Sequence, residues 1–275
     1  MKKTVLITGC SSGFGRTTAI YFANKGWNVI ATMRNPEKDT FLKDISGIQI
    51  LRLDVEDRQS ITTALEQGVA MFGSIDVLVN NAGFGLFGVF ESTPPEKIKE
   101  QFSVNVFGLM DVTRAVLPYM RKQGSGTIIN ITSGAGIFGL PSSSLYCASK
   151  FAVEGFSESL SYELASQGIK VKLVEPGGVV STQFGARVAK EALAVGIESY
   201  KSYEEKTAQL FANMRLERRG TEEQVAESIF EAANDSSYRL RYLPTKDILP
   251  WVTARRESNE ESYISLMQDS FKIGR

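Results

Sequence analysis

The 275-residue sequence predicts an α/β fold, a single Rossmann-type domain with a doubly wound parallel sheet and a C-terminal helical lid extension. Short runs rich in Val, Ile and Leu alternate with longer amphipathic segments, and this rhythm is typical of doubly wound sheets. The short runs are apolar at nearly every position, which indicates parallel strands covered by helices on both faces. No repeat, low-complexity tract or linker interrupts the alternation before Pro176.

The elements of this sheet can be placed one after another along the chain. The expected strands are Thr4–Thr8, Asn28–Met33, Ile48–Leu53, Val77–Asn80, Gly126–Ile131 and Lys170–Glu175. The expected helices between them are Phe14–Lys25, Arg58–Phe72, Pro95–Arg121 and Leu145–Ser166. A glycine follows the end of each helix, where the left-handed backbone of a C-cap favours that residue. These glycines are Gly26, Gly73, Gly124 and Gly168.

The rhythm changes after Pro176. Gln183–Gly220 has helical spacing without a strand, and we expect it to form a lid. Thr221–Ala233 begins like a capped helix, Tyr238–Leu243 is a candidate last strand, and the polar remainder favours helix. We therefore expect one domain over residues 1–275, with a nucleotide-binding core at about 1–182, a substrate lid at about 183–220 and an extension at 221–275.

The composition excludes several kinds of chemistry. The chain has no histidine, so a Ser-His-Asp or Cys-His nucleophile and any metal site built on imidazole are excluded. Two cysteines are too few for a four-thiolate site, and we expect no metal. Lys and Arg number 31, as do Asp and Glu, so the zero net charge gives no reason to expect nucleic acid.

The same composition predicts a cytoplasmic protein. The two cysteines make no disulfide framework, which is typical of a reducing compartment. The apolar run Val5–Ile7 is too short for a signal peptide. No stretch approaches the roughly 20 apolar residues of a membrane span.

Two glycine-rich motifs have a misleading form. Gly9–Gly13 matches the G-x-S-x-G nucleophile elbow, but the elbow serine needs a histidine base that this chain lacks. Gly83–Gly88 spells G-x-G-x-x-G after a strand, but residues 89–94 separate it from the next helix. We interpret the second motif as a loop beside the active cleft.

The first of these loops suits a phosphate better than a nucleophile. Thr8–Gly15 follows the first expected strand and leads directly into an amphipathic helix. Glycines allow the backbone to approach phosphate oxygens closely, and the helix N-terminus adds partial positive charge. An ordinary glycine-rich turn is the alternative, since the spacing departs from G-x-G-x-x-G.

Tyr146 and Lys150 are the candidate proton-transfer pair. Four residues apart on a helix, they lie on one face. A nearby ammonium favours the phenolate and should lower the tyrosine pKa from about 10. The pair can therefore transfer protons without histidine, although a surface helix can contain the same spacing by chance.

The combined motifs resemble the short-chain dehydrogenase/reductase family of the Tyr-x-x-x-Lys type. T-G-x-x-x-G-x-G stands at Thr8–Gly15, N-N-A-G at Asn80–Gly83, and the family's helix asparagine at Asn105. Its serine falls at Ser133, thirteen residues before Tyr146, and its P-G turn at Pro176-Gly177, followed by Thr182. Three strings, Thr8–Gly15, Ala31–Pro36 and Glu175–Val179, are most similar to the 17β-hydroxysteroid and retinol dehydrogenase-like subgroup.

The resemblance implies hydride transfer between a nicotinamide cofactor and an alcohol or carbonyl carbon. It implies that Tyr146 is the general acid/base, that Lys150 tunes it and binds ribose, and that Ser133 holds the substrate oxygen. Asn105 would help to position Lys150 and a proton-relay water. The implied cofactor-binding residues are Gly9, Ser11, Ser12, Gly13, Phe14, Gly15, Arg34, Asp54, Val55, Asn81, Ala82, Gly83, Tyr146, Lys150, Pro176, Gly177, Val179 and Thr182.

The end of the second strand favours NADP(H) over NAD(H). NAD-binding Rossmann folds usually place a carboxylate there, to accept the ribose hydroxyls. Here Met33 is followed by Arg34, which can pair with a 2′-phosphate, and Arg16 is a second candidate. A solvated surface arginine is the alternative interpretation of Arg34.

The substrate and the assembly are less constrained. Apolar side chains near the expected cleft suit a bulky apolar alcohol, ketone or aldehyde, although each could be a core residue instead. The substrate candidates are Phe84, Phe138, Leu140 and Phe184. An alternative function is a catalytically silent NADP-binding sensor or scaffold of the same fold. Family habit and the largely apolar helix Leu145–Ser166 predict a homodimer or homotetramer.

Overall fold

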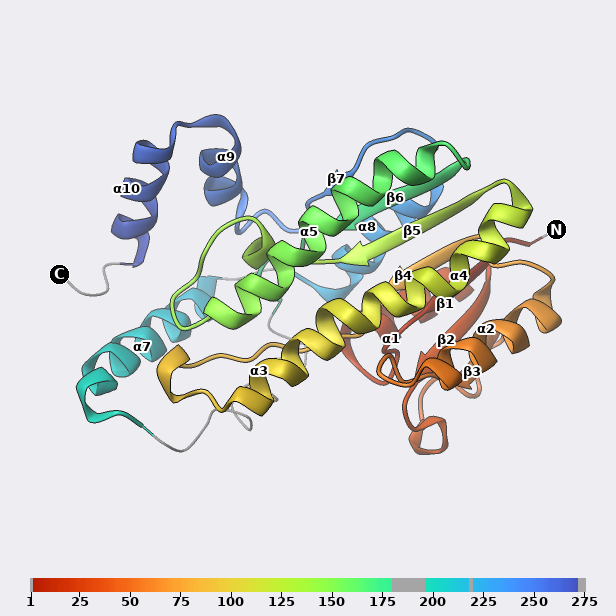
Figure 1. Cartoon of the computed structure of the whole chain (residues 1–275), viewed down its shortest axis with the longest axis horizontal. Coiled ribbons are helices and arrows are strands. Elements are labelled where there is room, and N and C mark those ends of the chain that lie inside the picture. Colours follow the sequence, from red (N-terminus) through yellow and green to blue (C-terminus); the bar gives the residue numbers. More distant parts are fainter. Residues whose placement is uncertain (1, 180–195, 218–219, 272–275) are drawn as a thin grey trace.

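The expected strands form one parallel sheet in the order β3-β2-β1-β4-β5-β6-β7. The structure is a computed structural model that describes residues 2–179, 196–217 and 220–271 (Figure 1). The strands are β1 (Thr4–Ile7), β2 (Asn28–Met33), β3 (Ile48–Arg52), β4 (Val77–Asn80), β5 (Gly126–Ile131), β6 (Ile169–Val174) and β7 (Arg241–Tyr242). The doubly wound parallel sheet that the apolar runs predict is thereby confirmed.

The strand order reverses between β1 and β4, and this reversal positions the site. Leu6 pairs with Leu78 and Ile7 with Val79, so both strands end at the same level. Ligands of open α/β sheets bind outside the carboxyl ends of the strands at such a switch point. The two glycine-containing motifs that follow β1 and β4 therefore lie side by side.

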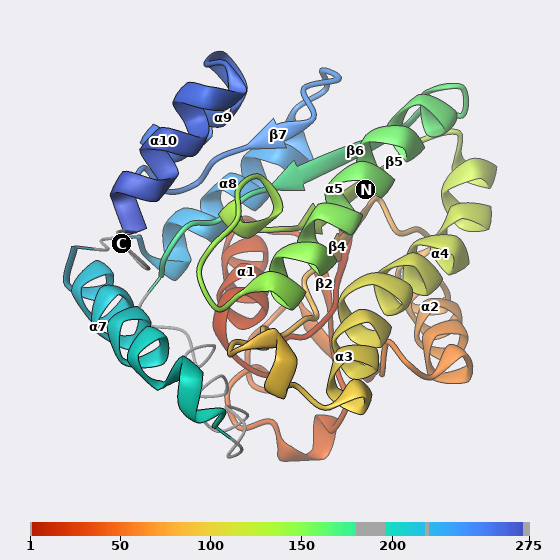
Figure 2. The same cartoon turned by 60° about the vertical axis from the view of Figure 1, so that its left-hand side comes forward.

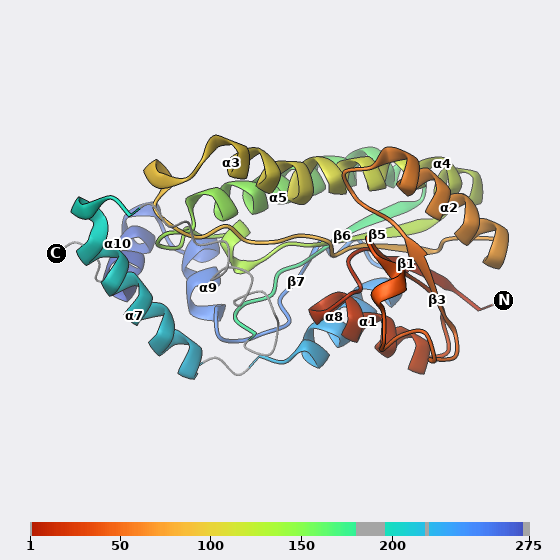
Figure 3. The same ribbon diagram turned by 90° about the horizontal axis from the view of Figure 1, so that it is seen from below.

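Helices cover both faces of the sheet (Figure 3). They are α1 (Gly13–Asn24), α2 (Arg58–Phe72), α3 (Pro95–Phe102), α4 (Leu109–Gln123), α5 (Ser144–Ala165), α7 (Lys201–Glu217), α8 (Glu222–Asn234), α9 (Leu249–Glu257) and α10 (Glu260–Phe271). Phe22 of α1 and Ile229 of α8 belong to the core on one face. Leu65 of α2, Val112 of α4 and Leu160 of α5 belong to the core on the other.

The predicted helix boundaries hold where local signals mark them. All four predicted cap glycines have left-handed φ angles, of 81° at Gly26, 81° at Gly73, 68° at Gly124 and 69° at Gly168. The Thr221 hydroxyl accepts from the backbone N–H of Gln224 at 3.2 Å, in a capping box that begins α8. Helix caps depend on only a few neighbouring residues, so the local sequence is enough to predict them.

Two elements differ from the prediction. The helix expected over Pro95–Arg121 is interrupted by a π-helical segment, Ser103–Gly108, which contains a polar side chain that bonds outside the helix. The expected strand Tyr238–Leu243 shrinks to the two residues of β7. Just before β7, the carbonyls of Ser237 and Arg239 accept hydrogen bonds from Nζ of buried Lys172, at 2.6 and 2.7 Å.

The C-terminal extension folds back over the end of the sheet where the site lies. Helices α9 and α10 lie side by side beyond β7 (Figure 2). Ile248, Val252, Tyr263 and Met267 form an apolar cluster with Phe138, which follows β5. Of the expected lid, residues 183–195 and 218–219 lie outside the described residues, and α7 is its described helix. None of the described helices combines the length and the apolar character needed to cross a bilayer.

Candidate active site

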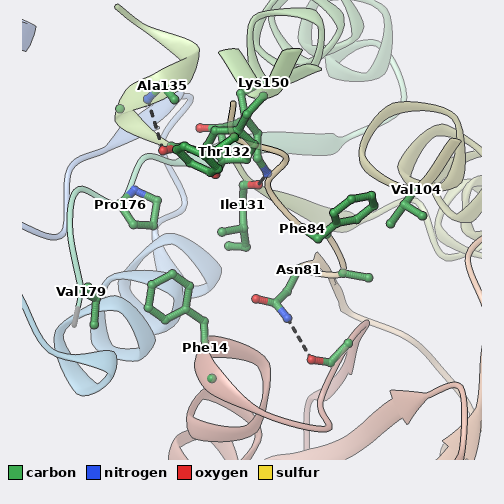
Figure 4. A pocket seen from close by; sticks show the side chains of 18 of the residues that line it. Phe14, Asn81, Phe84, Val104, Ile131, Thr132, Ala135, Lys150, Pro176 and Val179 are labelled. Atoms are coloured by element: carbon green, nitrogen blue, oxygen red, sulfur yellow. Dashed lines mark hydrogen bonds between the residues drawn. The ribbon is translucent and has the colours of Figure 1, made fainter. Parts of the chain in front are cut away.

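A cavity of about 1260 Å³ opens at the carboxyl ends of the strands (Figure 4). Loops after β1 to β6 line it, together with residues of α7 and α9. The predicted cofactor residues at its wall are Gly9, Ser11, Ser12, Gly13, Phe14, Arg34, Asp54, Val55, Asn81, Ala82, Gly83, Tyr146, Lys150, Pro176, Gly177 and Val179. Residues that are distant in sequence thus meet in one cavity, as predicted. Thr182 lies outside the described residues.

The loop after β1 presents its backbone to the cavity. Gly9 and Gly13 have left-handed φ angles of 74° and 55°, which carry the chain from the strand into α1. Ser12 precedes α1 without a side-chain cap hydrogen bond, so no side chain of this residue occupies the first N–H groups of the helix. Unpaired N–H groups at a helix N-terminus favour an anion.

Gly15, predicted as part of the cofactor-binding loop, is not among the residues that line the cavity and supports the loop from behind. A Cβ on Gly15 would contact the Gly9 carbonyl oxygen and would lie 2.5 Å from Nδ2 of Asn81. The Asn81 side chain in turn donates to the carbonyls of Thr8 and Gly9, at 2.9 and 3.2 Å. One hydrogen bond of Asn81 is drawn in Figure 4. Gly15 therefore allows α1 to begin against both motifs.

Thr8 is a residue to which the sequence assigned no individual role. Its hydroxyl oxygen accepts from the backbone N–H groups of Asn81 and Ala82, both at 3.0 Å. It lies at the end of β1 and is buried. Its position at the start of the T-G-x-x-x-G-x-G motif was the only sequence signal for Thr8. That the residues after β4 are its partners follows only from the order of strands in the sheet.

Ser133, Tyr146 and Lys150 converge at the cavity. One helical turn separates Tyr146 and Lys150 on α5, and Lys150 Nζ donates to the Ile131 carbonyl at the end of β5, at 2.8 Å. Ser133 follows that strand, and its hydroxyl bonds the Tyr146 phenol. Ser133 Oγ also accepts from the Ala135 N–H at 3.2 Å. Two hydroxyl groups are therefore presented together, with an ammonium nearby.

The electrostatics of the pair differ from the prediction. Burial raises the pKa of Tyr146 to about 12, and the hydrogen bond from Ser133 opposes this shift only in part. The net shift is upward rather than downward, because desolvation of the phenolate outweighs the neighbouring dipoles and charges. Burial lowers the pKa of Lys150 to about 8, against the opposing charge of Glu154. Lys150 Nζ lies 5.8 Å from the centre of the Tyr146 ring.

Asn105 is buried and lies behind the cavity wall. Its side chain accepts from the Phe84 N–H at 3.0 Å and donates to the Phe84 carbonyl at 2.8 Å. The amide also donates to the Ser149 hydroxyl at 3.2 Å. The Asn105 side chain therefore contacts the loop after β4 and the neighbour of Lys150 on α5, and its role in positioning Lys150 and a proton-relay water stays a prediction.

The end of the cavity beyond Tyr146 is mainly aromatic and aliphatic. Phe84, Phe138 and Leu140 line it as predicted, and Phe87 of the glycine-rich loop after β4 lies 5.5 Å from the Tyr146 ring, centre to centre. Phe184 lies outside the described residues. That loop borders the cavity as we interpreted it, and Gly83, Phe84, Phe87 and Gly88 are its lining residues.

The C-terminal extension supplies lining residues that were not predicted. Ile248 and Trp251, at the start of α9, contribute to the wall, and the Trp251 ring lies 5.3 Å from the ring of Phe138. The segment that contains them is polar and irregular in sequence, so no local pattern singled them out. Tyr203 of α7 accepts a hydrogen bond from the Ser142 backbone N–H at 2.9 Å.

Comparison with known proteins decides the family. The family model described as short chain dehydrogenase matches residues 3–192. The chain belongs to this family. An uncharacterised oxidoreductase of Bacillus subtilis, YusZ, is 37% identical over 268 residues, which cover 91% of this chain and 95% of the relative. The predicted family resemblance is confirmed.

Further relatives support the steroid and retinol dehydrogenase-like resemblance. Mouse 17-beta-hydroxysteroid dehydrogenase type 1 is 34% identical over 286 residues, covering 97% of this chain and 81% of the relative. Human retinol dehydrogenase 8 is 39% identical over 201 residues, covering 70% of this chain and 64% of the relative.

Solved structures share the fold and carry either nicotinamide cofactor. ElxO with NADP bound has a TM-score of 0.72 and 31% identity, covering 89% of this chain and 98% of that protein. A Burkholderia phymatum short chain dehydrogenase/reductase in complex with NAD has a TM-score of 0.79 and 27% identity, covering 97% and 95%.

Proposed function

We propose that this oxidoreductase uses NADP(H) to interconvert an alcohol and a carbonyl on a bulky apolar substrate. The observation that carries the proposal is the convergence of Ser133, Tyr146 and Lys150 on a cavity that the loop after β1 also lines. The cavity, at about 1260 Å³, exceeds the roughly 300–1,000 Å³ of an ordinary small-molecule site. It therefore has room for a dinucleotide and a second ligand.

The residues present fit such a dinucleotide. Gly9, Gly13 and the start of α1 would hold the phosphates, and Asp54 and Val55 the adenine. When bound, the nicotinamide supplies or accepts the hydride. Lys150 already donates one hydrogen bond to Ile131 and has further N–H groups for the ribose hydroxyls.

Tyr146, Ser133 and Lys150 carry out the proton transfer. In reduction, the Tyr146 hydroxyl donates its proton to the carbonyl oxygen while the Ser133 hydroxyl donates a second hydrogen bond to that oxygen. The Lys150 ammonium then stabilises the phenolate that Tyr146 becomes. A phenol with a pKa of about 12 stays protonated at neutral pH, which favours the reductive direction.

Arg34 supports the choice of NADP(H). It lies at the cavity wall directly after β2, and Met33 beside it offers no carboxylate for ribose hydroxyls. Guanidinium groups pair with phosphate through two parallel hydrogen bonds. Arg16, the second candidate, stacks on the exposed Phe41 ring at 4.0 Å and donates to the Ser11 carbonyl.

The test follows NADPH absorbance with retinal, estrone and benzil as carbonyl probes. Tyr146→Phe should lower kcat/KM by about 10²–10⁴-fold while NADPH still binds, because it removes the proton donor and leaves the loop after β1 intact. Tyr238→Phe is the matched control, since Tyr238 is exposed on a loop outside the site. Undiminished turnover in Tyr146→Phe would remove Tyr146 from the acid role. NADPH binding without turnover of any probe would favour a silent binding protein.

We also propose a homodimer or homotetramer. Helix α5 leaves Phe151 and Tyr162 exposed, and Phe107 is exposed on the π-helical segment. Exposed aromatic groups of this kind favour association. Light scattering at micromolar concentration should give a mass of two or four times 30.2 kDa, and a monomer mass would contradict the proposal.

A further inference from the structure

A cluster of charged side chains lies behind the Tyr146–Lys150 turn of α5, away from the substrate end. Its carboxylates are Glu154 and Glu158 on α5 and Glu175 directly after β6, and its guanidinium groups are Arg241 of β7 and Arg256 of α9. Glu175 is fully buried and Glu154 is 7% exposed. Four separate elements thus bring ionised groups together beneath the active-site wall.

Arg241 is the centre of this cluster. Its guanidinium lies 3.2 Å from Glu154, 2.5 Å from Glu158 and 3.4 Å from Glu175. Arg256 adds a second bond to Glu175 at 2.6 Å. Three acidic side chains therefore face two guanidinium groups, and the charge of Glu154 also acts on the Lys150 ammonium.

Glu154 is the carboxylate placed to act on Lys150. It follows Lys150 by one helical turn on the same face of α5, where charges at this spacing interact. Both side chains are more than nine-tenths buried, so water screens their interaction little. Gly136 packs against the same turn, since a Cβ there would lie 3.1 Å from Glu154 Cγ and 3.2 Å from the Lys150 carbonyl oxygen.

We propose that Glu154 is a positioning residue for the proton-transfer pair, because its carboxylate is the buried counter-charge that keeps Lys150 protonated. Arg241 holds that carboxylate at the required place. The proposal rests on the proposed function of Tyr146 and Lys150. Glu154 does not line the cavity, so its effect reaches the substrate only through Lys150.

The charged surroundings agree with this role. The charge of Glu154 raises the pKa of Lys150 against the larger effect of burial. Burial raises the pKa of Glu154 itself, whereas the Thr132 hydroxyl and the charges of Arg241 and Arg256 lower it.

The remaining neighbours of the two groups come from each element that packs around them. Lys150 faces the Tyr146 phenol on its own helix and the Ile131 carbonyl of β5. Glu154 is accompanied by Glu158 on α5 and by Glu175 directly after β6. Burial, and to a smaller extent the charge of Glu154, raises the pKa of Glu175 to about 7. A neutral residue at 154 would therefore remove the negative charge nearest to Lys150 on α5 while the two guanidinium groups remain.

The test measures the pKa of Lys150 directly. The reactivity of its amine toward acetic anhydride is followed against pH by peptide mass spectrometry of the intact chain. The wild-type midpoint is expected at about pH 8. In Glu154→Gln it should fall by about one pH unit, because loss of a nearby opposite charge disfavours the ammonium form. Glu154→Asp, which keeps the charge, should restore most of it.

Glu158→Gln is the matched control. It removes the 2.5 Å contact to Arg241 but neutralises a half-exposed carboxylate two turns from Lys150, and its midpoint should match the wild type. A second readout is the pH profile of kcat/KM with NADPH and benzil. Glu154→Gln should move the alkaline limb to lower pH and retain wild-type turnover near pH 6, whereas a merely structural defect lowers turnover at every pH.

An unchanged Lys150 midpoint in Glu154→Gln, or an equal fall in Glu158→Gln, would overturn the inference. Because the labelling needs no turnover, this result is independent of the proposed function. Retained turnover in Tyr146→Phe would instead overturn the proposed function while the Lys150 midpoint still reports on Glu154.

Discussion

Replacing Gly15 by alanine should displace the loop that follows β1. The added Cβ would lie 2.5 Å from Nδ2 of Asn81 and 2.9 Å from the carbonyl carbon of Gly9. Asn81 cannot withdraw freely, because its amide bonds two carbonyls at 2.9 and 3.2 Å. Gly9 is backbone in a tight turn with φ of 74°. The clash must therefore be relieved by moving α1 or the loop itself.

The size of the effect follows from two opposing contributions. Overpacking costs about 1–3 kcal/mol, and contact with fixed backbone places this case at the upper end. Alanine at a helical position gains about 1 kcal/mol over glycine. The free energy of unfolding should therefore fall by about 1–2 kcal/mol, which lowers Tm by about 2–8 °C in a chain of this size.

Gly155→Ala is the matched control within the same molecule. Gly155 lies inside α5, and no heavy atom of the same chain is found within 4 Å of a Cβ placed there. This substitution should raise the free energy of unfolding by about 0.5–1 kcal/mol. The same chemical change thus has opposite signs at two helical glycines.

The assay combines thermal unfolding, followed by circular dichroism, with NADPH titration followed by fluorescence. Gly15→Ala should lower Tm and weaken NADPH binding by about tenfold or more, since the phosphate-binding loop moves. Gly155→Ala should raise Tm and leave NADPH affinity unchanged. If Gly15→Ala also raises Tm and binds NADPH as the wild type does, the steric reasoning is refuted.

Two further predictions concern the cofactor and pH. Arg34→Asp should weaken NADPH binding by about tenfold or more relative to NADH, because a carboxylate repels the 2′-phosphate and accepts ribose hydroxyls; an unchanged ratio in calorimetric titrations would exclude Arg34 from cofactor choice. The pKa of Lys150 is about 8 in the folded chain and 10.5 in the unfolded chain. Between these pH values the unfolded chain binds more protons than the folded chain. The free energy of unfolding therefore gains a contribution from Lys150 that rises with pH over this range. Lys150→Met should lack this rise in urea unfolding measured across that range, and an identical slope in both proteins would contradict the lowered pKa.

Much of the fold could be predicted because its signals are local. A parallel strand covered on both faces must be apolar along its length, so β2 and β5 begin and end where the apolar runs do. A left-handed residue at a helix end favours glycine whatever the rest of the chain does, as at Gly73 and Gly124.

The elements that were predicted less well depend on distant partners. A six-residue π-helical segment has nearly the apolar spacing of an α-helix, and only the bonds from Asn105 to Phe84 and Ser149 reveal what it contributes. The chain just before the short last strand is bonded by Lys172, which lies 65 and 67 positions before Ser237 and Arg239 and donates to their carbonyls. Neither interaction produces a pattern in the sequence that predicts it.

The sequence by itself determined the family, the sheet and the residues that meet at the carboxyl ends of its strands, since motif spacing and apolar runs encode these directly. Only the tertiary structure decided which neighbours surround the proton-transfer pair. It placed Trp251 at the substrate end and Glu154 behind Lys150. It also reversed the predicted pKa shift of Tyr146, because desolvation depends on burial by the whole fold and not on the residue four positions away.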